Sequence, residues 1–150
     1  MSAPHGLGWL LGMLLVVAPP GLAAQRTWQA DIRIRALDVH PVGQGSLSVR
    51  IQVSTGDGEP AQASRLEVLI PVGIEVVRLS AGCRPSPSAV SGVSGRVTCE
   101  LGDLAVRGLH EVTLVTSRPP AGSGARFAAF VVSNTPDPVP ANNFAERVVQ

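Results

Sequence analysis

The feature that most constrains the fold is an alternation of apolar and polar residues, repeated along the chain between turn-forming segments. The alternating apolar positions are Ile32 and Ile34; Leu47, Val49, Ile51 and Val53; Leu66, Val68 and Ile70; Val97, Cys99 and Leu101; and Val112 and Leu114. A period of two with many β-branched residues predicts strands that bury one face. The apolar runs 74–79 and 127–132 and the closing segment 144–149 predict further strands. No stretch after the first 24 residues keeps a helical period, so no substantial helix is expected there.

Segments rich in glycine and proline at 41–45, 56–60 and 119–122 separate these strands. About seven to eight short antiparallel strands over residues 31–150 predict an all-β, immunoglobulin-like Greek-key sandwich. Phe127, Phe130 and Phe144 fall in apolar segments and are expected to face the core. Trp28 precedes the first strand, and it either packs against the end of the sandwich or stays exposed as an aromatic anchor.

The N-terminus has the pattern of a signal peptide. A ten-residue apolar run, 9–18, is followed by two prolines and a small-residue site, which predicts a leader helix over 1–24 and cleavage after Ala23 or Ala24. The run is too short for a membrane-spanning helix, and it departs from the usual pattern in having no Lys or Arg before it. Residues 25–30 then form a short polar lead. The mature protein is expected outside the cytoplasm, in the periplasm or at the cell surface, without stable membrane insertion.

The chain has two cysteines, Cys83 and Cys99, which enclose a loop rich in serine, proline and glycine. In an oxidising compartment this pair predicts a disulfide that closes the loop. A metal pair and a redox couple are the alternatives, but the spacing is unlike a C-x-x-C motif and no histidine lies nearby.

Three further motifs follow one another in the chain. Residues 70–74 are I-P-V-G-I, the second cysteine lies in T-C-E-L-G-D-L at 98–104, and residues 133–143 are S-N-T-P-D-P-V-P-A-N-N. Together they resemble the bacterial conserved-repeat surface domain, catalogued as domain of unknown function 11. The resemblance implies an immunoglobulin-like sandwich that serves as a structural or adhesive module outside the cell.

Three features depart from that family. Ser54-Thr55-Gly56 stands where the family often has Asn-x-Gly, and Val139 replaces an asparagine of the closing motif. The chain also has no lysine, which excludes the Lys–Asn isopeptide bond of some members.

Candidate site residues are few. Asp137, Asn142 and Asn143 either supply oxygens to a cation such as calcium or, as we favour, cap turns. The other polar candidates are interpreted as solvated strand or turn residues: Asp57, Glu59, Glu100, Asp103, His40 and His110. We therefore predict no catalytic, metal or cofactor-binding residue, and no cofactor.

The net charge of +1 gives no electrostatic signal for nucleic acid. We predict a non-catalytic secreted module with a structural, protein-binding or adhesive role, whose partners are extracellular or cell-surface proteins. It would bind through loops or by strand addition at a sheet edge, and the Cys83–Cys99 loop and the Arg33/Arg35 strand face are the surfaces to test first. The alternatives are an assembly subunit that completes its sheet with a partner strand and a secreted hydrolase.

Overall fold

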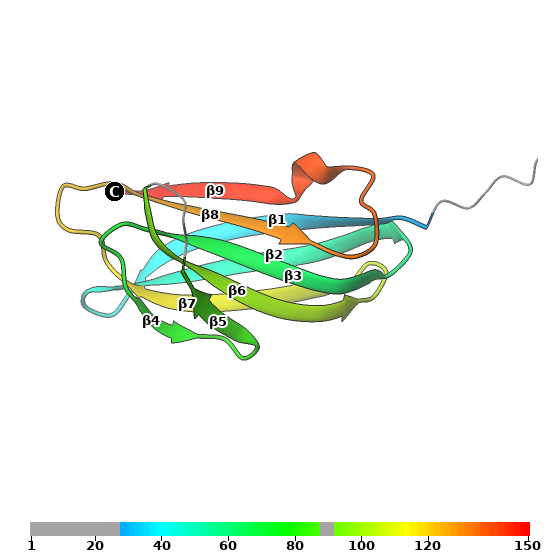
Figure 1. Ribbon diagram of the computed structural model, residues 1–150. Coiled ribbons are helices and arrows are strands. Elements are labelled where there is room, and N and C mark those ends of the chain that lie inside the picture. Colours follow the sequence, from blue (N-terminus) through cyan, green and yellow to red (C-terminus); the bar gives the residue numbers. More distant parts are fainter. Residues whose placement is uncertain (1–27, 88–91) are drawn as a thin grey trace, which may run out of the picture.

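The computed structural model describes residues 28–87 and 92–150, which form two β-sheets packed face to face (Figure 1). The first sheet has the strand order β1-β2-β7-β4 and the second has the order β5-β6-β3-β8-β9. The strands are β1 (Ala30–Val42), β2 (Ser46–Gly58), β3 (Ala61–Pro71), β4 (Val76–Leu79), β5 (Cys83–Ser86), β6 (Val93–Leu104), β7 (Leu109–Ser117), β8 (Ala125–Val132) and β9 (Phe144–Val149). A single 3-10 turn, η1 (Pro140–Asn142), precedes β9 among the described residues.

The topology is that of an immunoglobulin-like Greek key, as the sequence predicts. All strand pairs are antiparallel. The chain crosses between the sheets from β2 to β3 and again from β7 to β8, yet β2 pairs with β7 and β3 pairs with β8. This interlocking of two crossing connections defines the sandwich of immunoglobulin domains, and the order of the first sheet matches their A-B-E-D sheet.

The alternating residues form the core. Val49, Ile51 and Val53 of β2 are fully buried, as are Leu66 and Val68 of β3. Burying a side chain of this kind contributes about 1.5–3 kcal/mol, so the two inner faces together hold the sheets against each other. The largest fully buried side chain in the described part of the chain is that of Phe127.

The expectation that all three phenylalanines face the core is wrong for two of them. Phe127 points inward, but Phe130 is half-buried on the outer face of β8, and Phe144 is 52% exposed. The register pairs Phe130 with Phe144 across β8 and β9, so both side chains lie on the same outer face. Trp28 is 55% exposed, so it does not pack into the end of the sandwich and stays exposed to solvent.

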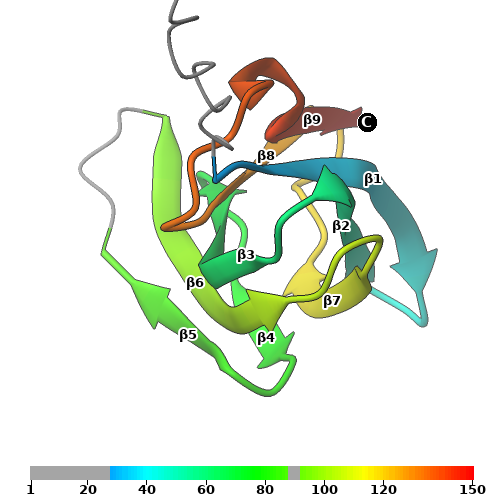
Figure 2. The ribbon, with the colours of Figure 1, turned by 90° about the vertical axis from the view of Figure 1, so that its right-hand side faces the viewer.

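The two sides of the sandwich differ. On one side β1 lies against β8 and β9 and closes the gap between the sheets, while β4 and β5 form the sheet edges on the opposite side (Figure 2). Because β4 and β5 have only four residues each, that side is covered by much less chain.

The predicted leader, its helix and the cleavage positions Ala23 and Ala24 lie outside the described residues. In the part of the chain that the structure covers, no helix is long and apolar enough to cross a membrane.

Candidate binding site

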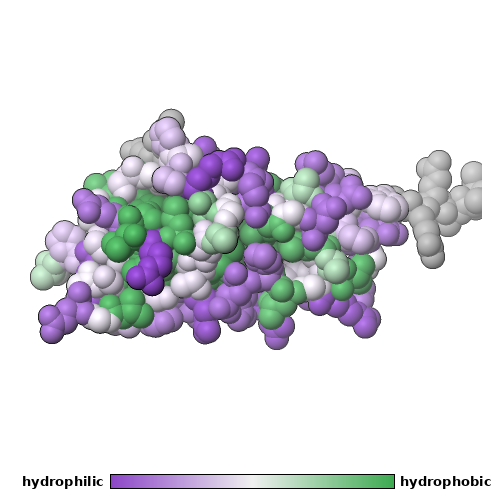
Figure 3. Space-filling model, turned by 90° about the horizontal axis from the view of Figure 1, so that it is seen from below, coloured by the Kyte–Doolittle hydropathy of each residue, from purple (hydrophilic) through white to green (hydrophobic). Residues whose placement is uncertain are grey.

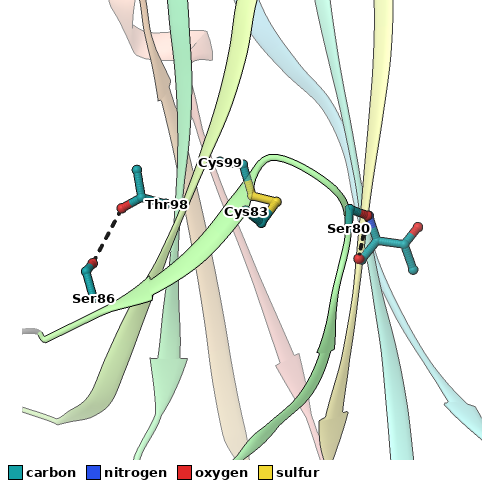
Figure 4. Close-up of a disulfide and its surroundings, with 6 residues drawn as sticks. Ser80, Cys83, Ser86, Thr98 and Cys99 are labelled. Carbon is teal, nitrogen blue, oxygen red and sulfur yellow. Dashed lines mark hydrogen bonds between the residues drawn. A yellow bond between two sulfur atoms is a disulfide. The ribbon is translucent and has the colours of Figure 1, made fainter.

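Residues 83–86, at the start of the expected loop between the cysteines, form a strand. Cys83 of β5 lies opposite Cys99 of β6, and the two form a disulfide with a Cα–Cα distance of 3.9 Å (Figure 4). Residues 83–86 pair with β6 as an extra edge strand, so the prediction of a loop over these residues is wrong. The strand carries Pro85, which has no N–H to donate, and edge strands tolerate such a residue.

Hydroxyl groups tie the β4–β5 connection to both sheets. The Ser80 hydroxyl donates to the Thr113 carbonyl at 2.8 Å and accepts from the Thr113 amide at 2.9 Å, which fixes the connection to β7. The hydroxyls of Ser86 and Thr98 lie 3.4 Å apart and join β5 to β6 (Figure 4). The disulfide and these contacts therefore hold the chain as it passes from one sheet to the other.

A cleft of about 620 Å³ opens between the two edges. Apolar side chains supply most of its lining, and polar groups stand among them: Ile70, Ile74, Val76, Val77, Leu79, Pro85 and Val97, with Glu75, Arg78, Ser86, Ser94, Gly95 and Arg96. Figure 3 shows the molecule from this side, with a group of apolar residues toward one end and a hydrophilic residue in their midst. The volume falls within the range of ligand-binding clefts.

The strand β4 forms one lip of the cleft. It pairs with β7 through three residues, and a register shift between Val76 and Arg78 leaves Val77 as an extra residue. A bulge of this kind re-aims side chains, and Val77 is 63% exposed. The free side of β4 therefore presents an apolar side chain next to unpaired backbone.

Polar groups fix the other walls. The Ser94 hydroxyl donates to the Pro71 carbonyl at 2.8 Å and lies 3.2 Å from the carbonyl oxygen of Ile74, which holds the β3–β4 turn against β6. Arg96 donates through Nη1 to Glu67 at 2.9 Å and through Nε to the Ser86 hydroxyl at 3.3 Å. The Glu67 side chain is only 9% exposed, so it anchors Arg96 at the lip.

The two serines that line this cleft hydrogen-bond to groups other than a base in the described residues: Ser94 donates to backbone carbonyls, and Ser86 accepts from Arg96. Glu75 supplies the single carboxylate of the cleft, and no histidine lines the cleft. The arrangement suits apolar side chains of a ligand, with hydrogen-bonding groups at the rim.

Two of the three candidate cation ligands, Asp137 and Asn142, form side-chain hydrogen bonds within the protein. The Asp137 carboxylate accepts from the amides of Ile32 at 3.1 Å and Val139 at 2.7 Å, and the Asn142 amide donates to Asp31 at 2.8 Å. The side-chain oxygens of Asn142 and Asn143 are buried and accept no hydrogen bond from described residues. No group of three or more His, Cys, Asp or Glu suited to a metal ion occurs in residues 28–87 and 92–150.

The remaining acidic candidates do not converge. Asp103 accepts from the Ala63 amide at 2.8 Å, and Glu100 pairs with Arg84 at 3.0 Å. Asp57 pairs with Arg107, whose hydrogen bond and positive charge hold the pKa of the Asp57 carboxyl below its usual value of 3.8. Glu59 makes no ion pair in the described part of the chain.

The two histidines singled out from the sequence, His40 and His110, lie on different strands of the first sheet. His40 lies opposite Ser48, and His110 lies opposite Val53. Both are exposed, as the sequence predicts.

The Arg33/Arg35 strand face lies beside a second hollow, of about 540 Å³. Arg107, from the β6–β7 turn, lines it together with these two arginines. The sequence contains no signal for this third arginine, because Arg107 lies more than 70 positions along the chain and only the fold brings it close.

Comparison with known proteins identifies no family. No protein-family model matches the sequence, and neither does any curated protein sequence. Among solved structures, a protein from Nocardia farcinica with an immunoglobulin-like fold matches with a TM-score of 0.44 and 18% identity, over 77% of this chain and 96% of that one. A chitin-binding domain from Streptomyces coelicolor matches with a TM-score of 0.44 and 14% identity, over 66% of this chain and 90% of that one. An exo-β-N-acetylglucosaminidase from Vibrio harveyi matches with a TM-score of 0.41 and 9% identity, over 83% of this chain but only 18% of the enzyme.

Proposed function

We propose that this protein is a non-catalytic binding module that takes up an extended segment of a partner protein in the cleft between β4 and β5. The observation that supports this is the open side of the sandwich, where an apolar cleft meets an unpaired strand edge. A buried apolar lining with a few polar groups at its rim is the common composition of a binding site.

The strand counts indicate how a partner would fit. The sheet that ends in β4 has four strands and the other sheet has five, ending in β5. A strand added beside β4 would lie over β5 and would pair with the free backbone groups of β4. Strand addition of this kind draws affinity from main-chain hydrogen bonds and specificity from pockets for alternate side chains.

The edge of β4 suits this role better than that of β5. Pro85 interrupts the row of backbone donors on β5, whereas β4 contains no proline. Side chains at alternate positions of the added strand would point inward and cover Val76 and Leu79, which are only partly buried. We therefore expect a partner segment with aliphatic residues at every second position.

The sequence motifs support a wider assignment to the conserved-repeat surface domains. The first motif spans the end of β3 and the turn after it, the second lies in β6, and the third connects β8 to β9. On this proposal the domain occupies residues 31–150 and acts outside the cytoplasm after cleavage behind Ala23 or Ala24. The disulfide is compatible with such a compartment. Sequencing the N-terminus of exported protein tests the cleavage, and a chain that begins at Met1 would contradict it.

The binding proposal is tested by selecting random ten-residue peptides on the immobilised protein and measuring their affinity for two valine variants. Val77→Glu places a charge on the lip of the cleft, while Val72→Glu places one at an equally exposed position, 65%, outside the cleft. We expect selected peptides to share aliphatic residues at alternate positions and to bind Val77→Glu at least about tenfold more weakly than Val72→Glu. Equal binding to both variants, or selected peptides with no alternation, would contradict the proposal.

A further inference from the structure

We propose that the second hollow, lined by Arg33, Arg35 and Arg107, binds carboxylate groups of an acidic polypeptide segment. This site is separate from the cleft. The cleft is built on the start of β6, whereas Arg107 follows the end of that strand, which is twelve residues long. At about 3.3 Å per residue the two sites lie near opposite ends of the sandwich.

Arg33 is held in place with donors to spare. Its Nε donates to the Ser54 hydroxyl at 3.3 Å, and its Nη1 lies 3.5 Å from a carboxylate oxygen of Asp31. Nη2 has no partner among the described residues. A guanidinium fixed in this way can donate to a carboxylate without losing much side-chain freedom.

Asp31 forms the ion pair with Arg33 and also has a second partner. One of its oxygens accepts from the Asn142 amide at 2.8 Å. The other oxygen lies 3.5 Å from Arg33 Nη1, beside Gly56, where an added Cβ would come within 2.8 Å of it. Asp31 therefore shares its carboxylate between Asn142 and Arg33 and helps to position the Arg33 guanidinium.

Arg35 supplies an uncompensated charge. All eleven acidic side chains of the chain lie within the described residues, and none of them pairs with Arg35. Arg107 is paired with Asp57, but both side chains are 78% exposed, and an ion pair exposed to this degree is weak enough to exchange partners. The hollow thus contains three arginines against two aspartates, with the excess at Arg35.

The spacing of the arginines favours a polypeptide ligand. Arg33 and Arg35 lie two positions apart on β1, and both are exposed; Arg35 is the extra residue at a register shift between Ile34 and Ala36, which re-aims its side chain. Acidic residues at alternate positions of an extended peptide lie about 7 Å apart, a spacing that two arginines so close on one strand can reach. Each arginine can then form a two-pronged hydrogen bond with one carboxylate.

The test is an NMR titration of the purified, isotopically labelled protein with a capped peptide that has glutamate at two alternate positions. We expect the amides around Arg35 and Gly56 to shift with a dissociation constant that rises with salt. The Arg35→Gln variant should bind about fivefold or more weakly, while Arg118→Gln, which removes an exposed arginine elsewhere, should bind as the unmodified protein does. Val77→Glu should also leave this binding unchanged, so the result does not depend on whether the cleft binds a peptide.

Two comparisons complete the test. The same peptide with glutamine at both positions should produce no saturable shift, and trigalacturonate, a carbohydrate that carries carboxylates, should bind more weakly than the glutamate peptide. Equal binding of the glutamine peptide, or no loss in Arg35→Gln, would overturn the site. Tighter binding of trigalacturonate would overturn its assignment to a polypeptide.

Discussion

Reducing the Cys83–Cys99 disulfide should destabilise the domain by about 3 kcal/mol. The cross-link joins residues 16 positions apart, and closing a loop of about 15 residues restricts the unfolded chain by roughly that amount. Cys99 is buried in the core beside β3, so the reduced thiol stays in an apolar environment and the sheets keep their packing. The loss should therefore come mainly from the greater freedom of the unfolded state.

The measurement is urea unfolding followed by circular dichroism, with and without a phosphine reductant. We expect the midpoint to fall and the slope to rise, because the reduced unfolded chain is less compact and exposes more surface. The double variant Cys83→Ser/Cys99→Ser is the control for the reductant, since its midpoint should not respond to it. A reduced protein within about 0.5 kcal/mol of the oxidised one would refute the reasoning.

Four other substitutions test the fold and the second hollow. Thr55→Val removes a buried hydroxyl that forms two hydrogen bonds with the β6–β7 turn. It should lower the free energy of unfolding by about 2 kcal/mol in the same urea assay. A loss under about 0.5 kcal/mol would show that the turn does not depend on this hydroxyl. Phe127→Ala should lower it by about 3–5 kcal/mol and Phe144→Ala by less than about 1 kcal/mol, and equal losses would contradict their opposite orientations. Arg107→Gln should raise the pKa of Asp57 toward 3.8 in an NMR titration. Because the folded-state pKa is lowered, the small stabilisation from this pair is present above pH 3.8 and is lost as the pH falls through the folded-state value; an unchanged pKa in the variant would rule out Arg107 as its cause.

The alternating residues were sufficient to predict the two-layer architecture. Positions such as Val49 and Ile51 are buried because every second side chain of a strand points toward the core between the two sheets. The pairing of the cysteines also followed from sequence, since no third cysteine competes with it.

Local patterns could not predict β5 or the orientation of Phe144. Residues 83–86 have no apolar alternation, and they form a strand only because β6 supplies a partner. Phe144 lies on an edge strand, where its register with Phe130 decides which face it takes. A run that is apolar on both faces gives no such information.

The candidate sites were the least predictable part. The cleft exists because β4 and β5 end their sheets without meeting, and its lining comes from four strands and the turns beside them. Arg33 and Arg35 were recognisable as a strand face, but their proximity to Arg107 depends on how β2 meets the β6–β7 turn.

The most direct test of the binding proposal is hydrogen–deuterium exchange of the protein with and without a selected peptide. Backbone amides of β4, from Val76 to Leu79, should exchange more slowly in the complex, because the added strand forms hydrogen bonds with the free edge. Amides of β9, the edge strand on the closed side, should exchange at the same rate in both states. Protection of β9 instead of β4, or a bound peptide that protects neither edge, would contradict the account.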